Sequence, residues 1–307
     1  MDVLRTADER FADLPGYPFE PHYTEVSNGE GGGLRVHYLD EGPADGEVVL
    51  LMHGEPSWSY LYRTMVPVLV EAGLRCVVPD LVGFGRSDKP ARQGDYSYAR
   101  HVAWMREALL DNLDLTGITL VGQDWGGLIG LRLVGVHPDR FARVVAANTG
   151  LPTGDQRLTE AFLDWQKFSQ ESPAFPIGRI VAGGCAVAPP DDVVAAYDAP
   201  FPDDAYTAGA RIFPSLVPTS PDDPAAAANR AAWETLAQWD KPFLTAFSDG
   251  DAITRGGERV FHRTVPGARD RSHVTIEGGG HFLQEDKGPE LAAVVAEFVA
   301  ATGSPAL

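Results

Sequence analysis

The stretch Val121-Gly122-Gln123-Asp124-Trp125-Gly126-Gly127 decides the fold of this 307-residue chain. It continues the short apolar run 118–121 and comes directly before the helix-like segment 128–137. Glycines on both sides of Asp124 permit a tight turn and let a strand and a helix approach each other closely. The sequence therefore predicts a strand, a sharp turn with Asp124 at its tip, and a helix.

Asp124 takes the place that serine usually holds in the Gly-x-Ser-x-Gly nucleophile elbow of α/β-hydrolases. An ordinary carboxyl group, with a pKa near ~3.9, is ionised at neutral pH and needs no base before it attacks. It can displace a leaving group from a saturated carbon and form an ester, which water must then hydrolyse with the help of a base. The alternative interpretation, an aspartate that only caps the following helix, does not account for the flanking glycines.

The rest of the chain alternates short buried runs with helix-like segments, which predicts an α/β fold with a mostly parallel central sheet and helices on both faces. We expect a final strand at residues 273–276 and a C-terminal helix at residues 289–301. The other expected strands are 47–52, 76–78, 118–121, 144–147 and 243–247, and the other expected helices are 60–70, 98–113 and 128–137.

Residues 151–224 break this alternation, because they are rich in proline, aspartate and aromatic residues and contain no strand-like run. We interpret them as a helical cap over the carboxyl edge of the sheet, where ligands of open α/β sheets bind. Residues 1–150 and 225–307 then form the α/β-hydrolase core domain.

A base and its carboxylate partner are expected after the last strands, in the chain order nucleophile, acid, histidine. His281 follows Gly278-Gly279-Gly280 in a loop after the last expected strand, which favours it as the base. Asp249 and Asp251 both follow the strand 243–247. We prefer Asp251, since the acid usually lies about four residues past this strand, whereas Asp249 fits a turn-forming role.

His53-Gly54-Glu55-Pro56 follows the strand 47–52, and this loop supplies one donor of the oxyanion hole in α/β-hydrolases. The expected donors are the backbone N–H groups of Glu55 and Trp125, directed at a carboxylate oxygen of Asp124.

With these motifs in place, the chain resembles the haloalkane dehalogenases of the α/β-hydrolase superfamily. The subgroup is the one with glutamate after the His-Gly of the oxyanion loop, and Glu55 and Trp125 are the most discriminating matches. The resemblance covers nearly the whole chain, in residues 5–11, 18–19, 37–42, 53–63, 79–80, 83–90, 121–127, 199–202 and 280–285.

This resemblance implies that Asp124 is the nucleophile, His281 the base and Asp251 its acid. It also implies a halide site formed by the indole N–H groups of Trp125 and Trp165, because an indole N–H can only donate. Trp233 and Trp239 are alternatives to Trp165, which could instead be a packing aromatic.

The implied reaction converts a small apolar haloalkane to a primary alcohol, a halide ion and a proton, without a cofactor or a metal. Leu128, Phe162, Phe168 and Phe213 are expected to line the apolar cavity, although residues 151–224 are the least similar part of the chain.

The composition narrows the possible partners. The net charge of −18 repels phosphate backbones, which argues against a nucleic-acid partner. A bound halide must therefore be held by local donors. Cys76 and Cys185 form no disulfide framework and no metal-binding spacing. There is no membrane-spanning apolar run and no signal peptide, so we expect a cytoplasmic protein, and a monomer.

Two other functions are compatible with parts of the pattern. An epoxide hydrolase shares the Asp elbow but needs a pair of acidic tyrosines, for which Tyr197 and Tyr206 are the candidates. A non-catalytic receptor with a hydrolase fold often lacks a triad residue, whereas this chain has all three. A fluoroacetate-type dehalogenase would need basic residues beside the pocket, and none stands out in the matching segment.

Overall fold

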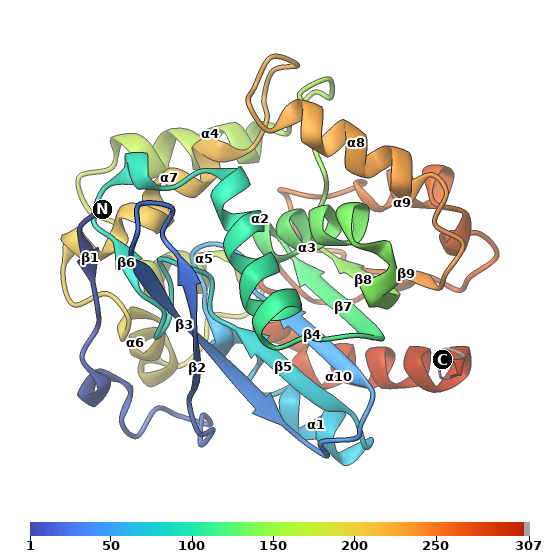
Figure 1. Cartoon of the computed structure of the whole chain (residues 1–307), viewed down its shortest axis with the longest axis horizontal. Helices are drawn as coiled ribbons and strands as arrows, with labels where there is room; N and C mark the ends of the chain where they lie inside the picture. The colour runs from blue at the N-terminus through green and yellow to red at the C-terminus, as the bar shows by residue number, and fades with distance from the viewer. Residues whose placement is uncertain (304–307) are drawn as a thin grey trace.

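The computed structural model describes residues 1–303, so the last four residues of the expected core segment 225–307 lie outside it. An eight-stranded sheet with the order β10-β9-β8-β7-β4-β5-β3-β2 forms its centre (Figure 1). The strands are β2 (His22–Ser27), β3 (Gly33–Glu41), β4 (Val48–Met52), β5 (Arg75–Pro79), β7 (Ile118–Gln123), β8 (Phe141–Ala147), β9 (Phe243–Ser248) and β10 (Val274–Ile276).

Pairing within this sheet confirms the predicted mostly parallel arrangement. All neighbours from β10 to β5 are parallel, while β3 pairs antiparallel with both β2 and β5. Every residue of β7, β8 and β9 is buried, as expected for strands covered by helices on both faces. The hairpin β2–β3 was not among the predicted strands, because β2 is a largely exposed edge strand without a continuous apolar run.

Helices cover both faces of the sheet. In Figure 1, α1 (Val66–Glu71) and α10 (Leu283–Thr302) lie on one side. On the opposite side lie α2 (Tyr98–Arg106), α3 (Trp125–Val136) and α8 (Ala226–Leu236). The helix α9 (Glu258–Thr264) follows β9 in the chain, and a separate two-stranded pairing joins β1 (Val3–Leu4) to β6 (Lys89–Pro90).

Three predicted helices differ from the observed ones. The segment 60–70 is divided into a 3-10 turn (Ser59–Tyr62) and α1. The segment 98–113 begins as α2 and continues as a π-helical stretch (Glu107–Asn112), a register change that periodicity does not reveal. The helix α10 begins at Leu283, before the predicted 289, and is interrupted at Lys287, ahead of Pro289.

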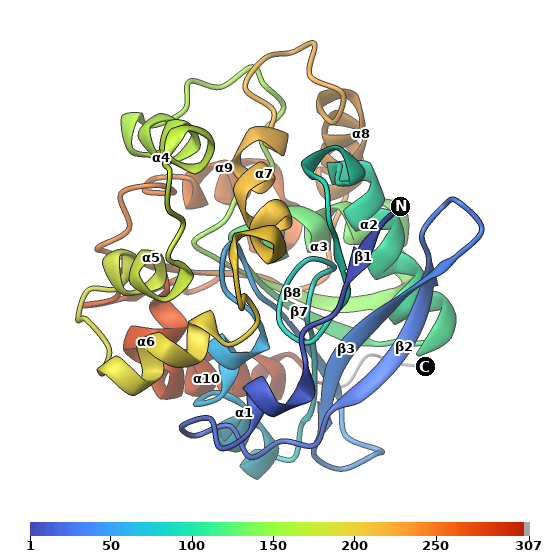
Figure 2. The same ribbon diagram turned by 90° about the vertical axis from the view of Figure 1, so that its left-hand side faces the viewer.

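Between β8 and α8 the chain forms four helices and no strand within the described residues. They are α4 (Glu160–Glu171), α5 (Ile177–Gly184), α6 (Asp191–Asp198) and α7 (Ala208–Leu216). Figure 2 shows them grouped on one side of the molecule. The α4 residues Phe162 and Trp165 line a cavity together with Asp124 at the carboxyl end of β7, so these helices cover the edge where the elbow lies.

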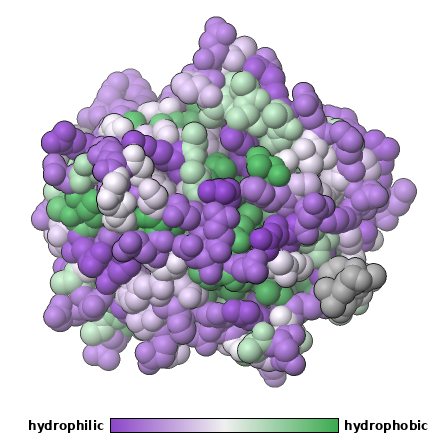
Figure 3. Space-filling model, in the orientation of Figure 1, coloured by the Kyte–Doolittle hydropathy of each residue, from purple (hydrophilic) through white to green (hydrophobic). Residues whose placement is uncertain are grey.

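The surface seen in Figure 3 is largely hydrophilic, with apolar residues in scattered groups. No helix within residues 1–303 is long and apolar enough to cross a membrane.

Candidate active site

Asp124 lies at the tip of the turn between β7 and α3 with φ 49° and ψ −124°, a conformation that L-residues rarely adopt. The turn is possible only because the glycines on either side of it, Gly122 and Gly126, lack side chains. A Cβ on Gly126 would lie 1.9 Å from the carbonyl oxygen of Met52, and one on Gly122 would lie 2.6 Å from Cα of Gly127. The strand, the turn and the helix are therefore packed backbone to backbone, which leaves the Asp124 carboxylate projecting from the tip.

One oxygen of this carboxylate is held by the oxyanion loop. The backbone N–H of Glu55 donates to Oδ1 of Asp124 at 2.8 Å. Within residues 1–303, no hydrogen bond from the backbone N–H of Trp125 reaches this carboxylate, so the structure places only one of the two expected donors on it. A Cβ on Gly54 would lie 2.5 Å from the same oxygen, which explains why this position is glycine.

His281 lies between two carboxylates. Its Nδ1 is 3.1 Å from Oδ2 of Asp251, and its Nε2 is 3.7 Å from Oδ2 of Asp124. Asp251 also accepts hydrogen bonds from the backbone N–H of Ile253 at 2.8 Å and from the hydroxyl of Thr254. The alternative acid, Asp249, is exposed and accepts a hydrogen bond from Gly278 N–H, so it lies in the turn rather than against the imidazole.

These contacts determine the charges. Burial of Asp251 favours its neutral form, but the charge and hydrogen bonds of His281, Thr254 and Ile253 outweigh it and lower its pKa to about 2. Burial also opposes the charged form of His281, but the two carboxylates outweigh it and raise the pKa of His281 to about 10. With Asp124 ionised, His281 is therefore an imidazolium near neutral pH, and loss of the Asp124 charge lowers its pKa.

Two buried residues that the sequence analysis did not single out position the His281 loop. The amide nitrogen of Gln123 lies 3.1 Å from the carbonyl oxygen of His281 and 3.3 Å from its Nε2. The amide of Asn148, which directly follows β8, donates to the carbonyl of Gly280 at 2.9 Å. Both are amide side chains at the carboxyl end of a buried strand, which is the signal that could have identified them.

Both candidate halide-binding tryptophans line one cavity of about 330 Å³ together with Asp124 and His281. Trp125 is 2% exposed and packs edge-on against Phe213, with ring centroids 4.6 Å apart. Trp165 stacks on Phe168 and Phe175. The N–H of Trp233 is already donated to the carbonyl of Leu151, and Trp239 lines neither cavity described here.

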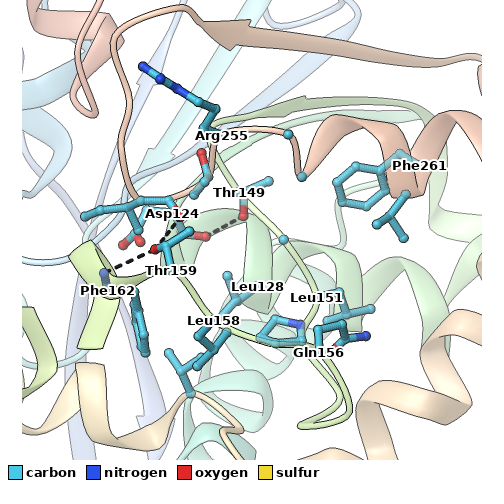
Figure 4. Close-up of a pocket in the computed structure, with 18 of the residues that line it drawn as sticks. Asp124, Leu128, Thr149, Leu151, Gln156, Leu158, Thr159, Phe162, Arg255 and Phe261 are labelled. Atoms are coloured by element: carbon cyan, nitrogen blue, oxygen red, sulfur yellow. Dashed lines mark hydrogen bonds between the residues drawn. The ribbon is translucent and has the colours of Figure 1, made fainter. Parts of the chain in front are cut away.

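A second cavity, of about 320 Å³, meets the first at Asp124, Phe162 and Ile253. Figure 4 shows its largely apolar wall, with Leu128, Leu151, Leu158 and Phe261, and the hydrogen bond from Thr149 to the backbone of Asp124. Phe162 and Phe168 line the first cavity, and Leu128 and Phe162 line the second. Phe213 was expected in the wall but lies behind Trp125 and lines neither, because α7 turns Pro214 toward the cavity instead.

The tyrosines considered for an epoxide hydrolase lie elsewhere. The hydroxyl of Tyr197 is buried and donates to Glu285 at 2.6 Å, and neither Tyr197 nor Tyr206 lines the cavities at Asp124. The described residues also contain no group of three or more His, Cys, Asp or Glu side chains placed to hold a metal ion.

Comparison with known proteins identifies the family of the chain. The family described as the alpha/beta hydrolase fold matches residues 47–288. The chain is 58% identical to a haloalkane dehalogenase of Psychrobacter cryohalolentis over 97% of its length and 98% of the relative's. It is 54% identical to haloalkane dehalogenase 1 of Mycobacterium tuberculosis, over 98% of its length and 100% of the relative's.

The chain thus has the fold of an α/β-hydrolase. It belongs to the haloalkane dehalogenases, hydrolases that act on carbon–halide bonds. A solved haloalkane dehalogenase from Paraglaciecola agarilytica, described as tetrameric, matches with a TM-score of 0.90 and 38% identity over 100% of both chains. The expectation that the present chain is a monomer stays a prediction.

The packing of the elbow predicts that Gly126→Ala destabilises the protein strongly. A methyl group 1.9 Å from the Met52 carbonyl oxygen forces the backbone apart, at a cost of about 3 kcal/mol or more. Urea unfolding measures the change in free energy. Gly94→Ala is the control, because a Cβ there meets no atom within 4 Å. Equal stability of the two variants would contradict the close packing.

The charge arrangement predicts that Asp124→Ala lowers the pKa of His281. Removing a nearby negative charge disfavours the imidazolium, so the pKa falls below its value of about 10 while Asp251 still supports the charged form. NMR titration of the His281 ring in both proteins measures the change. An unchanged or higher pKa in the variant would show that Asp124 does not influence the imidazole.

Proposed function

We propose that this enzyme cleaves the carbon–halogen bond by direct attack of Asp124 and hydrolyses the resulting ester with His281. The observation that carries the proposal is a single cavity lined by the Asp124 carboxylate, two indoles and the imidazole of His281. Asp251 and Asp80 also accept backbone N–H groups and lie beside a histidine, but of these three described carboxylates only Asp124 lines the cavity.

In the first step, an oxygen of Asp124 forms a bond to the halogen-bearing carbon as the carbon–halogen bond breaks, and the electron pair leaves with the halide. The Glu55 N–H binds Oδ1 of Asp124 at 2.8 Å, whereas Oδ2 lies 3.7 Å from Nε2 of His281, so Oδ2 is the less constrained oxygen and the better nucleophile. The product is an alkyl ester of Asp124 and a halide ion.

The growing charge on the halogen requires donors in an otherwise acidic protein. The indole N–H groups of Trp125 and Trp165 supply them, because both rings line the cavity together with Asp124. Preorganised donors of this kind stabilise charge that develops in the transition state.

In the second step, His281 takes a proton from water as the water oxygen bonds to the ester carbonyl carbon. The bond from that carbon to the alkyl oxygen then breaks, a primary alcohol leaves with the proton from His281, and the Asp124 carboxyl group loses its own proton to solvent. The ester carries no charge, so the pKa of His281 falls once Asp124 is alkylated, and the neutral imidazole needed for this step becomes accessible. Asp251 fixes Nδ1 as the protonated nitrogen and stabilises the imidazolium that forms.

The two cavities that meet at Asp124 bind different parts of the substrate. We assign the halogen to the cavity with the indoles and the alkyl chain to the apolar cavity with Leu128, Leu151 and Phe261. In this scheme residues 151–224 act as the cap, and residues 1–150 and 225–307 as the core domain.

The two-step scheme predicts that Asp124→Ala releases no halide, while His281→Gln releases about one halide per enzyme and then stops. The first step needs only the ionised carboxylate, whereas ester hydrolysis needs the base. Rapid-quench halide assays and intact-mass spectra of the Asp124 peptide follow the two products. His22→Gln, on the exposed edge strand, serves as the control and should turn over normally. Sustained turnover by His281→Gln, or halide release by Asp124→Ala, would refute the scheme.

The halide site predicts that Trp165→Phe weakens bromide binding by about 1.5–3 kcal/mol, the usual contribution of a hydrogen bond to a charged group. The ring volume is nearly kept while the N–H is lost. Bromide titration monitored by tryptophan fluorescence measures the affinity. Trp239→Phe removes an indole that lines neither cavity and should leave the affinity unchanged. Equal affinities in the two variants would rule out Trp165 as a halide ligand.

A further inference from the structure

The carboxyl group of Glu55 has no role in the scheme above, which uses only its backbone N–H. The residue is 3% exposed and lines the same cavity as Trp125 and Trp165. Its Oε1 atom is buried and has no hydrogen-bond partner among residues 1–303. A buried carboxylate that leaves one oxygen unpaired is costly, so the charge state of this group needs an explanation.

Two carboxyl groups in one cavity do not readily ionise together. The surroundings of Asp124 stabilise a negative charge better, because Asp124 accepts a backbone N–H and lies 3.7 Å from His281. The carboxyl group of Glu55 accepts no backbone N–H and forms no ion pair among the described residues. Burial and the charge of Asp124 raise the pKa of Glu55 well above its usual value, and the charge of His281 and the indole of Trp165 offset this only in part. Arg179, the remaining charged residue in the cavity wall, is exposed.

We propose that Glu55 keeps its proton and acts as a third hydrogen-bond donor to the leaving halide, beside the indoles of Trp125 and Trp165. This inference rests on the proposed function of the cavity. The carboxylic acid only donates a hydrogen bond: the electron pair of the broken carbon–halogen bond stays with the halide, and the proton stays on Glu55. A neutral acid donor suits this place, since an anion there would repel both Asp124 and the halide.

Ionisation of Glu55 reverses its effect. The carboxylate loses its O–H donor, places a negative charge beside the halide and competes with the halide for the indole N–H of Trp165. Halide affinity therefore falls as pH rises through the titration of Glu55. Asp124, His281 and Arg179 are the other charged residues that line this cavity. His281 also loses its positive charge at high pH, so the contribution of Glu55 must be separated from that of His281.

The test compares wild type, Glu55→Gln and Glu55→Leu in bromide titrations followed by tryptophan fluorescence between pH 6 and 10. Glutamine has nearly the same shape, keeps an N–H donor and cannot ionise, whereas leucine has no donor. We expect Glu55→Gln to bind bromide within about threefold of wild type at pH 6, and Glu55→Leu to bind about tenfold or more weakly. Affinity should fall more steeply with pH in wild type than in Glu55→Gln, whose remaining slope belongs to His281.

Urea unfolding of both variants identifies any loss of the fold, and the pH slopes of wild type and Glu55→Gln test the idea even if Glu55→Leu is unstable. Equal slopes, equally weak binding by folded glutamine and leucine variants, or wild-type affinity in Glu55→Leu would each overturn the role of Glu55. If Trp165→Phe also leaves bromide affinity unchanged, the proposed halide site itself is wrong. If Trp165→Phe weakens bromide binding as expected, only the proposed role of Glu55 is refuted.

Discussion

The conformation of Asp124 is the constraint on which the rest of the site depends. A positive φ at a residue with a side chain costs on the order of 1–3 kcal/mol and persists only where the surroundings enforce it. Here the enforcement is steric, because β7, α3 and the end of β4 meet through glycines whose Cβ positions are already occupied by neighbouring atoms. Because of this turn, the carboxylate projects beyond the edge of the sheet, toward the loops that carry Glu55 and His281.

The loops that follow the parallel strands bring the partners of Asp124 to its carboxylate. The loop after β4 delivers the Glu55 N–H, the turn after β9 delivers Asp251, and the loop after β10 delivers His281. Asn148, following β8, joins the backbone carbonyls of the His281 loop to the sheet, and Gln123 contacts the imidazole itself. Five parallel strands that end at one edge, β4, β7, β8, β9 and β10, therefore align groups that are up to 226 residues apart in the chain, as between Glu55 and His281.

Electrostatics then gives similar groups different roles. Asp251 is buried but surrounded by donors, which keeps it ionised as the partner of His281. Asp124 has one backbone donor and an open face toward the cavity, which suits a nucleophile. Glu55 is buried beside this charge with one carboxyl oxygen unpaired, which favours a neutral carboxyl group. Chemical identity alone does not distinguish these three carboxyl groups, whereas their hydrogen-bond partners do.

The sequence by itself determined the parallel core, the elbow and the chemical types at its centre, because these depend on local patterns: continuous apolar runs for β7, β8 and β9, and glycines on both sides of Asp124. It did not reveal the edge strand β2, whose exposed residues give no apolar run, or the π-helical end of α2. Only the tertiary structure could choose between Asp249 and Asp251 by contact, bring Trp165 of α4 into one cavity with Trp125, and place Phe213 behind that indole. The helices α4 to α7 are joined by irregular loops whose path no periodicity encodes, so the side chains they present to Asp124 follow from packing across the whole chain.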